Sequence, residues 1–403
     1  MYKKKVFLIL FSLTILISYI IGFIINENSI GSGGYNGDLK WIWDNFKIFK
    51  NENLISAIKS EDFFGNRSPL LYILNFYLNP FLDNIDTYRF SIFIFSIIGQ
   101  CIFFLCLKTK YKELKVETIL FLSSIILLSP FYRTSAYWGL EIQYGIISAL
   151  LSYYFFSKTE KVEDITHHNI FLSILFSSGA VYFDLKLIFV PLLIFLRFLS
   201  AKIDIEKKIL ITFLYFIFTV PYLLLVVLWN GLVPELTQLG NPLQGTHLST
   251  SKIHLVNFLF ATNMLGFYLF PFLIFKKNLF TKIKKIPNKF NGILIFVFCL
   301  YLFYFVSFNL FDYTDIFTKQ NGGYKDLYGL GYSLKLSNLI FNERLYALLF
   351  NLTVYIFSFA IILLVINSRV QNLLIISFFF LLSLFLFPLM QEYFDPYIFI
   401  IGA

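Results

Sequence analysis

The chain has 403 residues, of which 58% are hydrophobic and only 14% are charged, and its mean hydropathy is +0.73. Soluble domains are about half apolar and about a quarter charged, so this composition excludes a water-soluble globule. The aromatic share of 21% also excludes a disordered, linker-type chain. What remains is an all-α polytopic membrane protein, whose principal partner is the lipid bilayer.

Apolar runs long enough to cross a bilayer recur along the chain. A spanning helix needs about 20 predominantly apolar residues. The first run, 6–25, follows three lysines and has no cleavage site after it, so we expect an uncleaved signal anchor with a cytoplasmic N-terminus. About eleven spans are expected in a single membrane domain over 1–403. The others cover 89–107, 117–131, 140–156, 170–183, 185–199, 209–229, 255–275, 291–310, 345–366 and 372–390.

The net charge of +9 fits this pattern of spans. Most Lys and Arg residues fall in the segments expected to be cytoplasmic, as the positive-inside rule requires. The charge therefore indicates orientation, and no nucleic-acid partner is expected. The apolar run 69–82 is too short to span, and counting it as a span would move the lysines of 108–115 outside. We therefore predict an interfacial helix at 69–82.

The long segments between spans lie on the external side. They cover 26–88, 230–254 and 311–344, whereas the cytoplasmic segments are short and basic. We therefore expect any chemistry on the external face, and we expect 230–254 and 311–344 to be flexible loops over it. After Pro396 only seven residues remain, so the chain is expected to be a fragment or to end in an unusually short final helix.

Asp38 follows a glycine-rich turn just beyond the first span. A carboxylate at the mouth of a membrane cavity can act as a general base or bind a divalent cation. The alternative is that Asp38 caps the helix expected over 39–49. The sequence holds no metal-binding motif, and His247 and His254 do not form one. The sequence therefore assigns no cofactor, and a divalent cation stays a candidate.

Arg67 and Arg89 lie in the external part, where the positive-inside rule gives them no role. Guanidinium groups suit phosphate, so both are candidates to bind a lipid headgroup or a substrate diphosphate. Lys186 is a third candidate for a phosphate, and the alternative for it is a pair with Asp184. Arg89 has the alternative of reaching out of the bilayer to its interface.

Arg133 and Glu141 lie in segment 129–144, which is expected to be an external turn leading into a span. If that helix begins near Tyr137, Glu141 lies about one turn inside the bilayer. An ionised carboxylate there costs about 2.5 kcal/mol or more unless it is paired or faces water, so Glu141 is a site candidate. The alternative is a structural pair with Arg133 or Lys186.

The order of these features resembles the GT-C superfamily of polytopic glycosyltransferases, in particular the branch of protein O-mannosyltransferases and aminoarabinose transferases. Asp38 matches an early external Asp, Ser68-Pro69-Leu70-Leu71-Tyr72 matches a Pro-Leu-Tyr element, and Arg89-Phe90-Ser91 matches an arginine that opens the next span. Lys186 is similar to a basic residue in the middle spans. Leu39 stands where such enzymes often carry a glutamate. The resemblance covers 1–200, and beyond that it is one of topology.

This resemblance implies a reaction on the external face of the membrane, and the bias of the composition toward Phe, Ile, Lys, Asn and Tyr, which indicates an AT-rich genome, favours a bacterial inner membrane. A polyprenyl-phosphate-linked sugar donor would pass its sugar, with inversion, to a hydroxyl of a glycan, lipid or protein acceptor. Asp38 would accept the hydroxyl proton, and Arg89 and Lys186, with Arg67 or a divalent cation, would stabilise the leaving phosphate. Arg133 and Glu141 are further candidates for the substrate-binding site.

The sequence is also compatible with three other functions. A transporter or flippase would also carry many spans, although internal repeats typical of transporters are missing. A polymerase or ligase of lipid-linked glycans would carry similar external loops and arginines. In a non-enzymatic assembly subunit, Asp38 would be dispensable.

Overall fold

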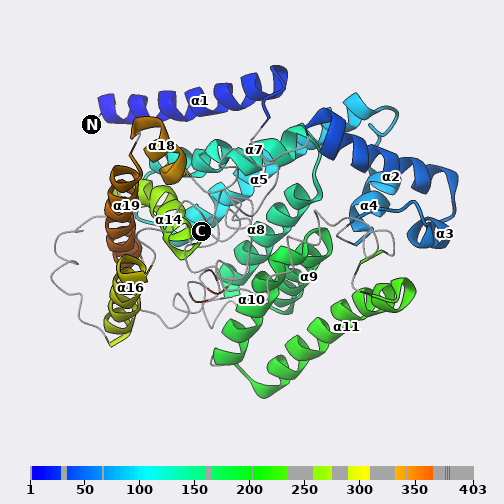
Figure 1. Ribbon diagram of the computed structural model, residues 1–403. Coiled ribbons are helices and arrows are strands. Elements are labelled where there is room, and N and C mark those ends of the chain that lie inside the picture. The colour runs from blue at the N-terminus through cyan, green and yellow to red at the C-terminus, as the bar shows by residue number, and fades with distance from the viewer. Residues whose placement is uncertain are drawn as a thin grey trace. The chain divides into compact units, whose positions relative to one another are not determined.

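The structure is a computed structural model that divides into two compact units, Met1–Pro242 and Leu243–Gly402. Each unit is built from helices, and no strand occurs among the residues that the structure describes (Figure 1). These residues are 2–28, 34–65, 68–159, 166–201, 203–231, 233–234, 257–274, 289–308, 332–341, 343–365, 377, 379 and 381.

Four helices in the described ranges are long and apolar enough to cross a membrane: Lys5–Ile24, Ile85–Lys110, Ile205–Trp229 and Leu345–Leu364. A fifth span results if Val116–Leu128 and Pro130–Tyr137, which meet at a bend of 68°, are counted together. The chain is therefore a helical membrane protein, as its composition predicts. The total of eleven spans stays a prediction, although helices occupy ten of the eleven expected positions. The expected span 372–390 lies largely outside the described residues.

Unit 1 contains most of the described helices. Their bounds are α1 Tyr2–Ile24, η1 Tyr35–Leu39, α2 Lys40–Asn51, α3 Leu54–Lys59, α4 Leu70–Leu78, α5 Ile85–Lys110, α6 Val116–Ser124, η2 Ile125–Leu128, α7 Pro130–Tyr137, α8 Glu141–Thr159, α9 His167–Phe183, η4 Leu185–Ile188, α10 Phe189–Ser200 and α11 Ile205–Trp229.

Side-chain caps determine where two important helices begin. The Asn84 side chain accepts hydrogen bonds from the backbone N–H groups of Asp86 and Thr87, and the Thr87 hydroxyl accepts one from the Asn84 N–H. This capping box starts α5 four residues before the expected span. Ser129 caps α7, whose first residue is Pro130, and proline is favoured there because it has no N–H to leave unpaired.

Small residues bring α8 close to α9 and to η4. Ser152 in α8 and Ser173 in α9 each donate a hydroxyl hydrogen bond to the other's backbone carbonyl, at 2.8 and 3.2 Å. A Cβ atom added at Gly145 in α8 would lie 2.6 Å from Leu187 Cδ1. Glycine and serine are typical of closely packed membrane helices because they let the backbones approach.

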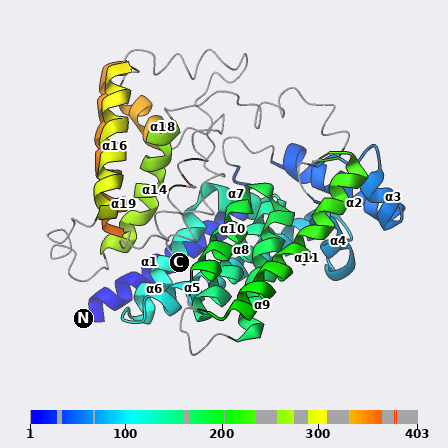
Figure 2. The ribbon, with the colours of Figure 1, turned by 90° about the horizontal axis from the view of Figure 1, so that it is seen from below.

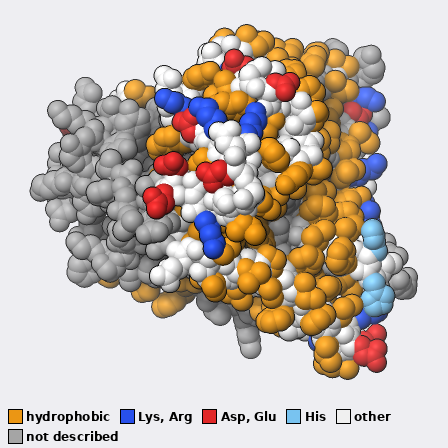
Figure 3. Space-filling view, turned by 90° about the vertical axis from the view of Figure 1, so that its right-hand side faces the viewer, with side chains coloured by type: hydrophobic (Ala, Val, Ile, Leu, Met, Phe, Trp, Pro, Cys, Tyr) orange, Lys and Arg blue, Asp and Glu red, His pale blue; other side chains and the backbone are white. Residues whose placement is uncertain are grey.

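The helices of unit 1 run between two ends that differ in their loops. At one end, Trp229 donates to the carbonyl of Ile58 at 2.9 Å, and Ser68 donates to that of Tyr182 at 2.6 Å. At the other, Lys5 forms an ion pair with Glu117 at 3.0 Å. In Figure 3 a broad surface of hydrophobic side chains separates an area with acidic and basic groups from an edge with histidine and basic groups. The first end, which we call the loop end, joins segments predicted to be external.

The first predicted external segment forms the short helices η1, α2, α3 and α4, which lie beside the start of α5 (Figures 1 and 2). The expected helix 39–49 corresponds to α2, which buries Ile42, Asn45, Phe46 and Phe49. The expected interfacial helix 69–82 corresponds to α4, which has nine residues and is too short to span a bilayer.

Unit 2 packs α14 Asn257–Ile274 against α19 Arg344–Val365, together with α16 Lys289–Phe308 and α18 Tyr332–Ile340 (Figure 2). The Asn263 amide donates to the Ser333 hydroxyl at 3.0 Å, and the Asn351 amide to that of Ser337 at 2.9 Å. Part of the segment 311–344, which we expected to be a loop, is therefore the helix α18. The segment 235–256, with His247 and His254, lies outside the described residues, and so does the C-terminus after 381.

Candidate functional site

The segment 129–144 is more than the turn that the sequence suggests. It forms the helix α7, which bends by 68° from the preceding helix and buries every residue from Phe131 to Tyr137. Helix α8 then begins at Glu141, so this carboxylate lies at the first residue of its helix and not one turn inside it. The difference arises from the turn at Gly139, whose φ of +68° breaks the helix.

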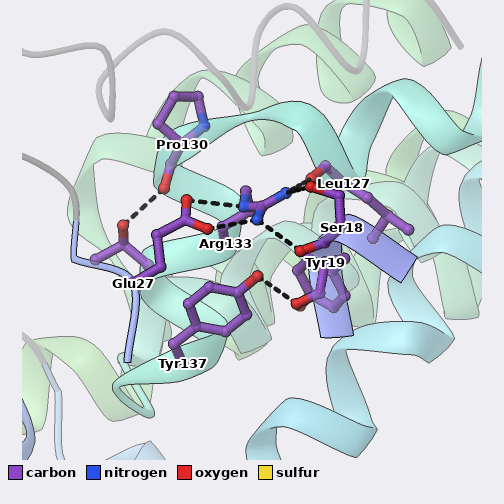
Figure 4. Close-up of polar contacts among 8 residues, drawn as sticks. Ser18, Tyr19, Glu27, Leu127, Pro130, Arg133 and Tyr137 are labelled. Carbon is purple, nitrogen blue, oxygen red and sulfur yellow. Dashed lines mark hydrogen bonds and ion pairs between the residues drawn. The ribbon is translucent and has the colours of Figure 1, made fainter. Parts of the chain in front are cut away.

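Arg133 in α7 is bound from several sides by α1 and the residues after it (Figure 4). Its Nε donates to Glu27 Oε1 at 3.0 Å, and its Nη2 donates to Glu27 Oε2 and to the carbonyl of Ser18 at 2.9 Å. Tyr137, one turn further along α7, donates to the carbonyl of Tyr19 at 2.6 Å. Arg133 thus pairs with Glu27 and not with Glu141, and this ion pair attaches α7 to the end of α1.

Arg89 in α5 binds the last residue of α7 and the end of α1. Its Nε donates to the carbonyl of Tyr137 at 2.7 Å and its Nη2 to that of Phe23 at 3.0 Å. The guanidinium carbon lies 4.4 Å from the ring centre of Phe23 and 4.5 Å from that of Trp138. Arg89 is half-buried, and Asp86 and Tyr35 interact with it electrostatically. The Arg89 guanidinium is therefore fixed by two aromatic rings and two carbonyls, and part of it stays exposed.

Tyr88, next to Arg89, fixes the turn between α7 and α8. Its hydroxyl donates to the carbonyl of Gly139 at 2.7 Å. A Cβ atom at Gly139 would lie 2.7 Å from the Tyr88 ring, so the close approach and the positive φ both require glycine. The neighbouring residues Tyr88 and Arg89 thus set where α8 starts.

Glu141 belongs to a buried chain of hydrogen bonds. The Tyr72 hydroxyl in α4 donates to Glu141 Oε1 at 3.2 Å, and the Asn45 amide in α2 donates to the Tyr72 oxygen at 2.8 Å. The same Asn45 amide donates to the carbonyl of Phe64 at 2.7 Å, and its oxygen accepts from the Phe64 N–H at 3.3 Å. We call Asn45, Tyr72 and Glu141 the polar chain. It joins α2 and α4, which are predicted to be external, to the start of α8.

The element Ser68–Tyr72 is held at its first residue by the end of α9. The Ser68 hydroxyl donates to the carbonyl of Tyr182 at 2.6 Å. Two residues further along, Asp184 is 2% exposed and accepts from the backbone N–H of Lys186 at 2.9 Å. Lys186 itself is half-buried at the start of η4. The predicted phosphate ligand Lys186 and the Pro-Leu-Tyr element are therefore neighbours, whereas Arg67 lies outside the described residues.

Asp38 lies in η1, a π-helical turn that leads directly into α2. The residue before α2 is Leu39, which is itself helical, so Asp38 lies inside the helical segment and not at its first residue. Asp38 is half-buried and precedes Asn45 by seven residues, which is two helical turns. Single π-turns inside helices occur often at functional sites.

The loop end therefore brings together most of the residues predicted from the sequence. Arg89, Glu141 and Lys186 lie on elements that contact one another through Ser68, Tyr72 and the turn at Gly139. Within the described ranges, no group of three or more His, Cys, Asp or Glu residues is placed to hold a metal ion. A divalent cation stays a prediction.

Two residues of this region, Glu27 and Asn45, were not predicted from the sequence. Asn45 had a signal, because it interrupts the apolar face of α2 formed by Ile42, Phe46 and Phe49. Glu27 had none, because a single carboxylate after a span does not reveal a partner 106 residues away.

Comparison with known proteins does not assign the chain to a family. No protein-family model matches the chain, and neither a curated protein nor a solved structure matches it. A function for the chain is therefore argued from its own residues.

Proposed function

We propose that the protein is a membrane glycosyltransferase that uses a polyprenyl-phosphate-linked sugar donor, similar in plan to GT-C enzymes and active on the external face of the bacterial inner membrane. One observation carries the proposal. Asp38, the Ser68–Tyr72 element, Arg89 and Lys186 come from separate parts of unit 1, and the hydrogen bonds of Tyr72 to α2 and of Ser68 to α9 join three of their elements at the loop end.

The proposed reaction needs a base, an anion site and access to lipid. The acceptor hydroxyl oxygen forms a bond to the anomeric carbon of the sugar while the bond from that carbon to the phosphate oxygen breaks. The electron pair leaves with the polyprenyl phosphate, and the hydroxyl proton passes to Asp38. Inversion follows because attack and departure occur on opposite faces of the carbon.

The basic residues have different roles in the proposed reaction. Arg89 presents a guanidinium held between Phe23 and Trp138, and such fixed donors stabilise the charge that develops on a leaving phosphate. Lys186 would supply a second positive charge, and Arg67 or a divalent cation a third. Arg133 donates to protein groups and is 7% exposed, so its part is to hold α7.

The test uses purified protein in proteoliposomes with a panel of radiolabelled polyprenyl-phosphate hexoses and pentoses. Release of polyprenyl phosphate is measured together with sugar transfer to an envelope glycan extract. We expect D38N to abolish both without loss of protein yield. The matched control is D44N, because the Asp44 side chain in α2 is 47% exposed and pairs with Lys47 of the same helix.

Two results would contradict the proposal. Full activity in D38N would remove Asp38 as the base. Movement of the intact donor across the bilayer, with no cleavage in the wild type, would identify a flippase instead of a transferase.

A further inference from the structure

The polar chain of Asn45, Tyr72 and Glu141 is buried at the loop end. The three side chains are 4%, 2% and 6% exposed, respectively. The rings of Phe46, Phe49 and Phe63 surround Tyr72, with centroids 5.1 to 5.6 Å from its own. Side chains packed in this way do not contact a substrate directly.

The charge of Glu141 also argues against a phosphate ligand. A carboxylate repels a lipid phosphate, and it is retained in an apolar surround only when hydrogen bonds hold it. Tyr72 supplies such a bond from α4. Buried polar networks of this kind specify one arrangement of the elements that they join.

The polar chain fixes the position of the helical segment that contains Asp38. Asn45 lies two turns after Asp38 in one continuous helical segment, η1 followed by α2. Asn45 is the side chain of α2 that the polar chain holds, and it also binds both backbone groups of Phe64. The rotation and the depth of α2 therefore depend on its bonds.

We infer that Glu141 is a positioning residue, which acts through Tyr72 and Asn45 to hold Asp38 in place for proton transfer. The inference rests on the proposed function, because it assigns Asp38 as the base. It differs from the expectation that Glu141 binds the substrate, since it assigns to Glu141 a role through its bond with Tyr72.

The test compares E141A, E141Q and Y72F with Y77F as the control, because Tyr77 is on the same helix and 65% exposed. E141A and Y72F should lower kcat by about tenfold to a hundredfold with an unchanged KM for the donor, as expected for a misplaced base. E141Q keeps an oxygen that accepts from Tyr72, so it should recover most of that loss. Y77F should behave as the wild type.

A second measurement does not depend on activity. Hydrogen–deuterium exchange of the α2 amides, Lys40–Asn51, should be faster in E141A and Y72F and near wild type in E141Q. Unchanged exchange in both E141A and Y72F would overturn the inference, because α2 would then not depend on Glu141. E141Q as inactive as E141A, with wild-type exchange, would also overturn it by showing that the charge acts directly. If the wild type cleaves no donor, the proposed function fails, and the exchange data still decide whether Glu141 holds α2.

Discussion

Glu27 and Arg133 are 106 residues apart in the sequence, and yet Arg133 Nε lies 3.0 Å from Glu27 Oε1. The arginine side chain is 9% exposed and that of the glutamate 38%. Removing one partner of a buried pair leaves a charge without compensation, whereas exposed pairs contribute little. The two partners should therefore differ in what their loss costs.

E27Q should lower the free energy of unfolding by about 3 kcal/mol, because it leaves the buried Arg133 charge without its carboxylate. R133A should cost less, about 1.5 kcal/mol, because the Glu27 carboxylate that loses its donor is 38% exposed and can be hydrated. The measurement is reversible unfolding in mixed detergent micelles. K47M is the control, because the Lys47–Asp44 pair is exposed and should contribute less than about 0.5 kcal/mol. Equal losses in R133A and K47M would show that the Glu27 pair is not structural.

G22A should destabilise the same contact from the side of α1. A Cβ atom at Gly22 would lie 2.5 Å from Arg133 Nη2 and 2.6 Å from the Tyr137 hydroxyl, so the pair must shift. Overpacking of this kind costs about 1–3 kcal/mol. In α9, a Cβ at Gly179 meets nothing within 4 Å, so G179A should be neutral or slightly stabilising. Thermal unfolding of the two variants side by side provides the comparison, and equal midpoints would contradict the prediction.

R89K should weaken the proposed use of the donor even though the charge is kept. A lysine ammonium cannot donate to the carbonyls of Tyr137 and Phe23 and at the same time stack between the rings of Phe23 and Trp138, as the planar guanidinium does. Hydrogen bonds from charged groups contribute about 1.5–3 kcal/mol, and Arg89 is proposed to stabilise the charge that develops on the leaving phosphate, so kcat/KM for the donor should fall by about tenfold or more. Initial rates over a series of donor concentrations measure this, with K59R at an exposed position of α3 as the control. An unchanged kcat/KM in R89K would remove Arg89 from the anion site.

The predicted orientation is tested by cysteine labelling in intact cells, in a C101A/C106A/C299A background. N53C, between α2 and α3, should react with an impermeant maleimide, because the loop end is predicted to face outward. K112C, between α5 and α6, should react only after the membrane is permeabilised. Both sites are exposed, so a difference reports sidedness and not burial. Labelling of K112C alone would reverse the topology.

Much of the fold could be predicted because apolar length and amphipathic spacing are local properties. Helix α2 begins at Lys40, one residue from the expected start, since its apolar residues recur with helical spacing. The start of α5 was misplaced by four residues, although Asn84 and Thr87 carry a capping signal in the sequence itself. Ser129-Pro130 was a similar signal for α7.

The site was less predictable because it depends on partners that are distant in the sequence. Arg89 and Glu141 were identified as unusual charges at the edge of the membrane, but the groups that they contact, Tyr137 and Tyr72, could not be deduced from one sequence. Hydropathy also does not register the bend before α7, because the apolar run continues up to it. Spacing thus predicts which residues are unusual, and only packing identifies their partners.

The bend before α7 has a consequence for how the chain is assembled in the membrane. A short polar helix cannot stay in lipid by itself, because the backbone groups at its ends need partners. The partners of α7 include Ser18 and Tyr19 in α1 and Ser96 in α5, and these three precede it in the chain. Most of the groups that α7 needs are therefore already present when it is synthesised, and Gln143 in α8, which accepts from Ser135, follows.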